Sequence, residues 1–287
     1  MRVNVTLVVL CLIWSNILLG QSKVHVSEIE ERNVGGERVL FANEEMYEGI
    51  VYENYVKKKL KYSVRDGKKN GPYELFYENG QLRRKTNFKD DKYDGSYEEY
   101  YEDGQLSIKT SFKEGKYDGP LLMYYKNGNL MGKGYHVAGS YEGVQEKYYE
   151  NGKLKSSITY ARGLKEGLSV KYYENGDLKE RAFYQADELH GVYENYYEDM
   201  VLYIRTNYKE GLKDGAYEMF FENGKIKRKG FYKEGREDGP FEIYHENGHL
   251  KRKGFFKDGK LSGESESYDD SGKLISRGNY RNGQELG

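Results

Sequence analysis

The side chains of this sequence that could do chemistry are aromatic rings at a fixed spacing. A tyrosine or phenylalanine recurs every 24 residues, and each ring offers contact area with, for tyrosine, a polar tip. Two interpretations are open: the rings cover a sheet between charged pairs, or they form a track that binds a ligand. The nine rings are Phe76, Tyr100, Tyr124, Tyr148, Tyr172, Tyr196, Phe220, Tyr244 and Tyr268.

A second candidate is a histidine pair in the segment HENGH, from His245 to His249. It matches the H-E-x-x-H pattern of zinc proteases, which requires a helix so that both imidazoles project from one face. Here Asn247 and Gly248 predict a hairpin turn instead, and His25, His136 and His190 are scattered along the chain rather than set at the spacing of metal ligands. We therefore expect no metal site, no cofactor and no catalytic residues.

These residues belong to an internal repeat. A glycine recurs with a period of 24 residues, at 71, 95, 119, 143, 167, 191, 215, 239 and 263. An Asn-Gly or related pair follows eight residues after each of them. The chain therefore divides into nine tandem units over residues 71–287, preceded by a degenerate repeat at 49–70. Residues 21–48 fit no unit, and we expect them to lead into or cap the first one.

Turn chemistry indicates a β-hairpin in each unit. Asn-Gly pairs such as Asn151-Gly152 favour a two-residue type I′ turn, in which both central residues have positive φ. Segments such as EGKYDG, residues 114–119, predict a second and longer turn. Two strands of about eight residues connect these turns. The predicted fold is all-β, an elongated antiparallel β-meander of tandem 24-residue β-hairpin repeats, with about 18 to 20 strands in sequential order.

The predicted turn also sets the register. Counting from the first glycine of each unit as position 0, it places position 2 opposite 15, position 3 opposite 14 and position 6 opposite 11. Opposite charges then face each other at Glu74/Lys85, Glu98/Lys109, Glu194/Arg205, Glu218/Lys229, Glu242/Lys253 and Glu266/Arg277. Positions 2, 4, 6, 11, 15 and 17 form the expected buried face, where glycines at position 15 let rings lie over bare backbone.

Composition and the N-terminal residues restrict the possible partners and the cellular location of the protein. The charges nearly cancel, with 46 Lys and Arg against 47 Asp and Glu, which argues against nucleic-acid binding and disfavours a membrane surface. Residues 1–20 predict a signal peptide and hence a periplasmic, envelope-associated or secreted protein. Cys11 is the only cysteine, so the chain after cleavage has no disulfide or thiolate chemistry.

The hairpin motif, as in YYENGKLK at Tyr148 and FYENGQLR at Phe76, resembles the bacterial variant of the MORN repeat. The similarity covers residues 71–287 and is weaker from 49. The resemblance implies a long twisted β-meander that acts as a protein- or membrane-associated scaffold. The bacterial variant is also called antitoxin-like by association.

We expect a non-catalytic scaffold that binds an extended protein or peptide. Alternatives are a carbohydrate- or cell-wall-binding array and an antitoxin-like neutralising binder; association between copies of the chain stays open. Leu122, Ser157 and Val170 interrupt the charged pairs, so Tyr124, Tyr148 and Tyr172 have the fewest charged neighbours. Because an exposed apolar patch there would mark a contact surface, these three rings are the predicted centre of the site, with Tyr100 and Tyr196 beside them.

Overall fold

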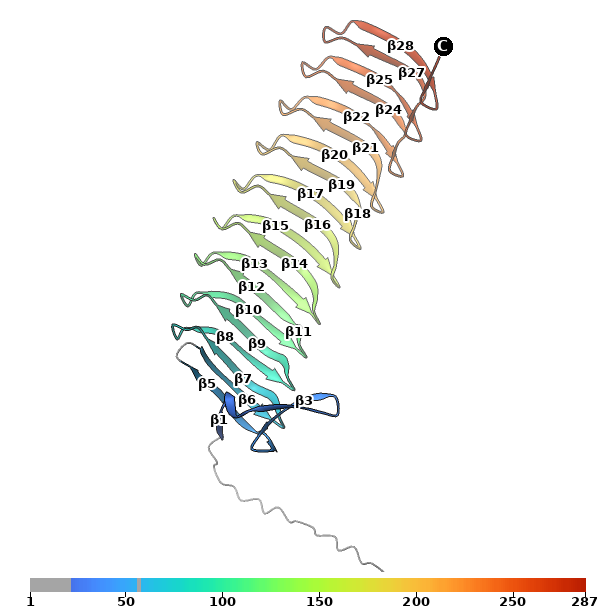
Figure 1. The fold of residues 1–287 in the computed structure, drawn as a ribbon. Coiled ribbons are helices and arrows are strands. Elements are labelled where there is room, and N and C mark those ends of the chain that lie inside the picture. The colour runs from blue at the N-terminus through green and yellow to red at the C-terminus, as the bar shows by residue number, and fades with distance from the viewer. Residues whose placement is uncertain (1–21, 56–57) are drawn as a thin grey trace, which may run out of the picture.

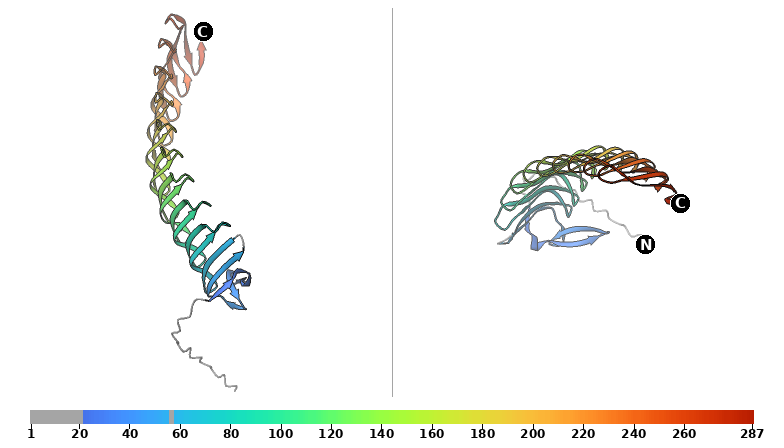
Figure 2. Two further views of the ribbon diagram at one scale, coloured as in Figure 1. Left: turned by 90° about the vertical axis from the view of Figure 1, so that its left-hand side faces the viewer. Right: turned by 90° about the horizontal axis from the view of Figure 1, so that it is seen from above.

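One long sheet forms most of the molecule, with its strands lying across the long axis (Figure 1). The computed structural model describes residues 22–55 and 58–287, so the predicted signal peptide at 1–20 lies outside the described residues. Within the described part the main sheet has 26 strands, and from β5 onward the strands that pair with each other are antiparallel. The sheet curves along its length (Figure 2).

The strand bounds follow the repeat. The strands of the main sheet are β1 (Lys23–His25), β5 (Gly49–Tyr55), β6 (Lys58–Arg65), β7 (Lys68–Phe76), β8 (Leu82–Lys89), β9 (Lys92–Tyr100), β10 (Leu106–Lys113), β11 (Lys116–Tyr117), β12 (Gly119–Tyr124), β13 (Leu130–Val137), β14 (Ser140–Tyr148), β15 (Leu154–Ala161), β16 (Leu164–Tyr172), β17 (Leu178–Gln185), β18 (Glu188–Leu189), β19 (Gly191–Tyr196), β20 (Leu202–Lys209), β21 (Leu212–Phe220), β22 (Ile226–Lys233), β23 (Arg236–Glu237), β24 (Gly239–Tyr244), β25 (Leu250–Lys257), β26 (Lys260–Leu261), β27 (Gly263–Tyr268), β28 (Leu274–Arg281) and β29 (Gln284–Leu286).

The strand number exceeds the predicted 18 to 20 for two reasons. In four units the strand that precedes the Asn-Gly turn is interrupted, which splits it into β11 and β12, β18 and β19, β23 and β24, or β26 and β27. In addition, β1 precedes the repeats and β29 is a short final strand that pairs with β28. The β1 strand pairs parallel with β5 and is an exception to the antiparallel meander. The predicted fold class is confirmed.

The two turns of each unit are the reverse of the prediction. At Asn-Gly only the glycine has positive φ, as at Gly152 (85°), and its N–H donates to the carbonyl of Tyr149. This is a longer turn of the type I plus left-handed glycine kind. The two-residue turn with positive φ at both centres lies at the other end, as at Glu114 (51°) and Gly115 (80°).

Asn-Gly takes the longer turn because the asparagine side chain there forms hydrogen bonds with backbone groups that a two-residue turn would leave out of its reach. The Oδ1 atom of Asn151 accepts a hydrogen bond from the N–H of Lys153, and its Nδ2 donates to the carbonyl of Glu174 in the next unit. The same link to the next unit starts from Asn79, Asn127, Asn175, Asn223 and Asn247.

The longer turn changes part of the register. Positions 3 and 14 are opposite in all six charged pairs, as at Glu194 and Arg205, so this prediction is confirmed. Position 11 does not face position 6, however. It faces position 5, as Leu178 faces Tyr172, because a β-bulge takes up the extra residue.

The buried face is a thin layer of rings. Positions 2 and 15 are the most buried positions of this face. At one such pair the Tyr217 ring lies over Gly230, as expected, and a Cβ added to Gly230 would come within 2.9 Å of the ring. Ring contacts at centroid distances of 4.4 to 6.1 Å continue unbroken from Tyr62 to Tyr160. We call this side of the sheet the aromatic face.

The N-terminal segment packs on the aromatic face at one end of the array. A turn of 3-10 helix (Val26–Glu28) leads into a small sheet of β2 (Glu30–Val34), β3 (Glu37–Ala42) and β4 (Glu45–Met46). Leu40, Ala42 and Tyr47 from this segment form a buried cluster with Val51, Tyr62 and Val64 of the first hairpin. The small sheet lies on the inner side of the curve (Figure 2).

Candidate binding face

The opposite side of the sheet, which we call the charged face, carries positions 1, 3, 5, 14 and 16. The five predicted site tyrosines each occupy the last residue of a strand, next to the Asn-Gly turn. All five are half-buried, so less of each ring is accessible than the sequence suggests. These residues are Tyr100 on β9, Tyr124 on β12, Tyr148 on β14, Tyr172 on β16 and Tyr196 on β19.

Three of the five tyrosines are tied to a carboxylate two residues earlier. Tyr100 donates its hydroxyl to Glu98 at 2.8 Å, Tyr196 to Glu194 at 2.8 Å, and Tyr148 to Glu146. Burial and the bond to Glu98 raise the pKa of Tyr100 to about 12. Glu146 also pairs with Lys133, so Tyr148 has charged neighbours as Tyr100 and Tyr196 do, although it is predicted to be among the rings with the fewest. Only Tyr124 and Tyr172 have an apolar residue in place of that carboxylate, Leu122 and Val170.

The backbone of the same tyrosines joins neighbouring units. The hydroxyl of Tyr149, at position 6, donates to the carbonyl of Tyr172 in the next unit at 2.8 Å. The carbonyls of Tyr100, Tyr124, Tyr148 and Tyr196 accept equivalent bonds. Position 5 therefore has a structural role in every one of these units, whatever its ring contacts.

The charged pairs form one ladder that crosses the unit boundaries. Each position-14 residue lies opposite two position-3 residues, one in its own unit and one in the next. Arg181, for example, lies opposite Val170 in its own unit and opposite Glu194 in the next, which it binds at 2.6 Å. Further pairs across boundaries are Lys133–Glu146, Lys229–Glu242 and Lys253–Glu266. The sequence analysis found only the pairs within units.

The repeat is the feature that relates this chain to known proteins. The sequence profile described as MORN repeat variant matches it at residues 69–90, 93–114, 117–138, 141–161, 165–186, 213–234, 237–258 and 261–282, together more than half of its length. The chain belongs to the MORN repeat variant family. MORN repeats indicate a repeat-based binding scaffold. None of the curated proteins compared with the chain matches it.

The MORN matches omit one unit, between residues 186 and 213. This unit has Asp199-Met200 in place of Asn-Gly, and Met200 takes the glycine conformation with a φ of 63°. The preceding turn also lacks its usual glycine, because Asp187 has a φ of 71° there. The unit nevertheless keeps the hairpin register of its neighbours.

The MORN-variant array exposes an apolar stripe that the sequence analysis missed. It is formed by positions 1 and 16, which are paired across each hairpin, as Leu168 is paired with Phe183. In the centre of the array the stripe is most exposed at Tyr135 (48%), Val144 (51%), Leu168 (42%), Phe183 (42%) and Val192 (37%). We call these five residues the central patch. Apolar residues at positions outside the expected buried face were the signal that could have identified the stripe.

The ladder is interrupted beside the central patch. The successive partners across the strands are Lys109, Leu122, Lys133, Glu146, Ser157, Val170 and Arg181. Leu122 breaks the ladder once and Ser157 with Val170 breaks it again. Exposed apolar side chains lie in this region, although positions 1 and 16 supply most of them and the tyrosines lie at their border.

The histidine pair lies in a MORN turn. His245 substitutes for the position-6 tyrosine, with Nε2 at 3.0 Å from the carbonyl of Tyr268. Nδ1 of His249 lies 2.7 Å from the carbonyl of Asp270. Both imidazoles therefore link two turns. In residues 22–55 and 58–287 no cluster of His, Cys, Asp and Glu suits a metal ion, and no helix is both long and apolar enough to cross a membrane.

Proposed function

We propose that the array is a non-catalytic scaffold that binds an extended polypeptide through the central patch, in the cell envelope or outside the cell. The observation that carries the proposal is the exposure of Val144, Leu168 and Phe183 where the charged ladder is broken. Exposed contiguous apolar surface on a soluble protein is typical of interaction sites. The predicted signal peptide at 1–20 supports the location.

The shape of the surface favours a chain over a compact ligand. Apolar and charged rows run side by side across successive strands, so contacts repeat along the array. A polypeptide lying across the strands meets both rows in each unit. Tyr124, Tyr148 and Tyr172 border the patch on the side of the Asn-Gly turns, where half-buried rings add contact area.

Capture of partners from envelope extracts tests the proposal. The double variant Leu168→Ser with Phe183→Ser should lose partners that the parent chain retains, because it removes the two paired apolar side chains of the patch. Leu212→Ser is the matched control, since Leu212 is 51% exposed but lies beside a turn, away from the patch. Unchanged capture by the double variant would contradict the proposed site.

A second variant tests the tyrosines. Replacing Tyr124, Tyr148 and Tyr172 by serine should weaken capture while the β-sheet signal in circular dichroism persists. If this variant unfolds, the rings serve the sheet only. Capture of cell-wall glycans in place of proteins would favour the carbohydrate-binding alternative.

A further inference from the structure

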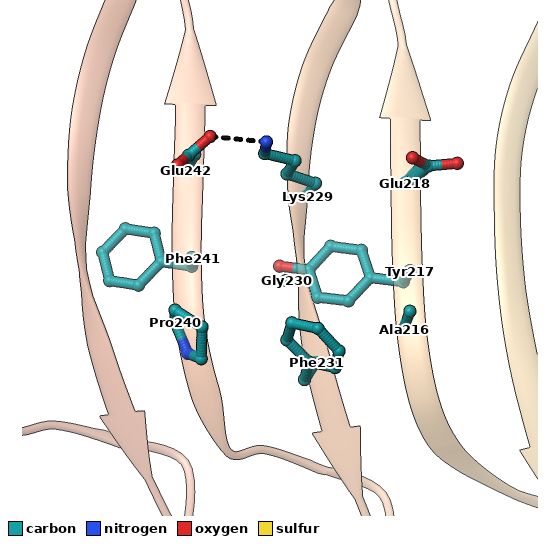
Figure 3. A pocket seen from close by; sticks show the side chains of 9 residues that line it. All are labelled: Ala216, Tyr217, Glu218, Lys229, Gly230, Phe231, Pro240, Phe241 and Glu242. Carbon is teal, nitrogen blue, oxygen red and sulfur yellow. Dashed lines mark ion pairs between the residues drawn. The ribbon is translucent and has the colours of Figure 1, made fainter.

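The structure has two adjacent hollows on the charged face, away from the central patch. The first, of about 280 Å³, is lined by Ala216, Phe231 and Pro240 on one side and Glu218, Lys229 and Glu242 on the other (Figure 3). The second, of about 290 Å³, repeats the arrangement one unit later. It uses Pro240 and Phe255 with Glu242, Lys253, Glu264 and Glu266.

Both hollows lie between an apolar row and a charged row of side chains that cross the strands. The apolar row crosses the strands from Ala216 to Phe231 and from Pro240 to Phe255, which are paired in register. The charged row runs beside it through Glu218, Lys229, Glu242, Lys253 and Glu266. Phe231 is 46% exposed and Phe255 is 40% exposed, so the rings are open to a ligand.

Phe231 and Phe255 differ from the other aromatic residues at position 16 in their spacing. Position 16 is aromatic at Tyr135, Phe183, Phe231 and Phe255. Only Phe231 and Phe255 occupy consecutive units. Two strands separate them, which corresponds to about 9.6 Å along the array.

That spacing matches one class of polypeptide. A polyproline II helix repeats every three residues with a rise of about 3.1 Å per residue, so equivalent side chains recur about every 9.3 Å. Such helices bind in aromatic-lined grooves, and their ordering costs little because the conformation is preformed. Successive prolines of a segment with proline at every third position would meet Phe231 and Phe255 in turn.

Charge complementarity defines the segment further. Four acids, Glu218, Glu242, Glu264 and Glu266, line the two hollows together with Lys229 and Lys253. Lys229 pairs with Glu242 and Lys253 with Glu266, each at 2.7 Å, and Arg277 binds Glu264 and Glu266. Glu218 has a partner only at 3.5 Å, in Arg205, so an acidic excess faces the first hollow.

We propose that the two hollows bind a proline-rich segment in the polyproline II conformation, with proline at every third position and an adjacent lysine or arginine directed toward Glu218. This site lies two units beyond Phe183 and does not depend on the central patch. Its ligand would lie along the array, across the strands.

Fluorescence polarisation with the full chain tests the proposal. The probe is a fluorescein-labelled peptide of repeated Pro-Pro-Ala that ends in arginine, and saturable binding is the expected result. The double variant Phe231→Ser with Phe255→Ser should bind about tenfold more weakly or not at all. Leu212→Ser, which removes an exposed apolar side chain that lines neither hollow and lies outside the central patch, should bind like the parent.

Two further comparisons define the recognition. Replacing the terminal arginine of the peptide by glutamate should weaken binding, as should Glu218→Gln. Circular dichroism and thermal melting should show that each variant keeps the parent fold, because both rings are exposed. Absence of saturable binding, or equal loss in the Leu212→Ser control, would overturn the proposal. Binding of a soluble cell-wall glycan that depends on the same two rings would also overturn it.

Discussion

The Nε atom of Arg205 donates a 2.9 Å hydrogen bond to the carboxylate of Glu194, whose side chain is only 2% exposed. Arg181 of the preceding unit binds the other carboxylate oxygen at 2.6 Å. One buried acid thus joins two units of the array. The charged face, which lies opposite the predicted buried face, therefore contains the largest fully buried side chain of the described residues.

Glu194→Ala should lower the free energy of unfolding by about 1–3 kcal/mol, the usual cost of losing charged hydrogen bonds at a buried site. Arg181 and Arg205 are about half exposed, so water compensates part of the loss. Urea unfolding measures the change. Glu218→Ala is the control and should cost less than about 1 kcal/mol, because Glu218 is 36% exposed and pairs at 3.5 Å. Equal losses would contradict the prediction.

Acid should destabilise the array through the same row of carboxylates. Hydrogen bonds from Lys253, Tyr268 and Arg277 lower the pKa of Glu266 to about 2. Burial raises the pKa of Glu194, but bonds from Arg205, Tyr196 and Arg181 outweigh it and leave the pKa lowered. A lowered folded-state pKa gives stability above the unfolded value of about 4.3, which is lost as pH falls through the folded value.

The melting temperature should therefore stay level above about pH 5 and fall toward pH 2. Glu266→Gln provides the comparison, because glutamine does not titrate. The difference in melting temperature between the parent and this variant should shrink as the pH falls. A constant difference from pH 7 to pH 2 would show that the ion pairs of Glu266 do not contribute to the pH dependence.

Met200→Gly should stabilise the protein by about 0.5–1 kcal/mol, because Met200 has a φ of 63° in a conformation that glycine adopts without strain. Asp187→Gly should gain less, although Asp187 has a similar φ of 71°. Its carboxylate accepts a 2.7 Å bond from the N–H of Lys165, which glycine would remove. Thermal melting ranks the two variants. Hydrogen exchange should be fastest around residues 187–202 in the parent, and slow exchange there would argue against a weak unit.

The asparagine link between turns can be separated from the turn itself. Asn151→Asp keeps the acceptor for Lys153 but removes the donor to the carbonyl of Glu174. It should cost about 0.5–1.5 kcal/mol, and Asn151→Ala should cost more because both bonds are lost. Asp103 already has this arrangement, with its carboxylate bonded to the N–H of Gln105. Unchanged stability of Asn151→Asp relative to the parent would show that the link to Glu174 contributes nothing.

The period, the hairpins and the charged register could be predicted because they depend on contacts within one unit. The pairing of Glu98 with Lys109, for example, can be predicted because opposite charges recur at the same two positions of successive units. The turn types could not be predicted this way. Asn-Gly is compatible with both turns, and the choice follows from bonds such as that of Asn151 to the next unit, which no local pattern contains.

The candidate site was predicted in part. Breaks in the ladder at Leu122 and Val170 located the region, because they are visible as missing charges. The residues with most exposed apolar area, such as Leu168 and Phe183, were not identified. Positions 1 and 16 vary in residue type from unit to unit, so no recurring apolar residue marks them in the repeat.

The strands lie across the long axis of the molecule, and this direction has a mechanical consequence (Figure 1). A force that separates the two ends loads the hydrogen bonds between neighbouring strands in tension, so that they open a few at a time instead of resisting together in shear. The array should then extend stepwise under low load, and each unit of 24 residues releases about 80 Å of chain. Anchored at one end, it would act as an extensible tether whose steps begin at its least stable unit.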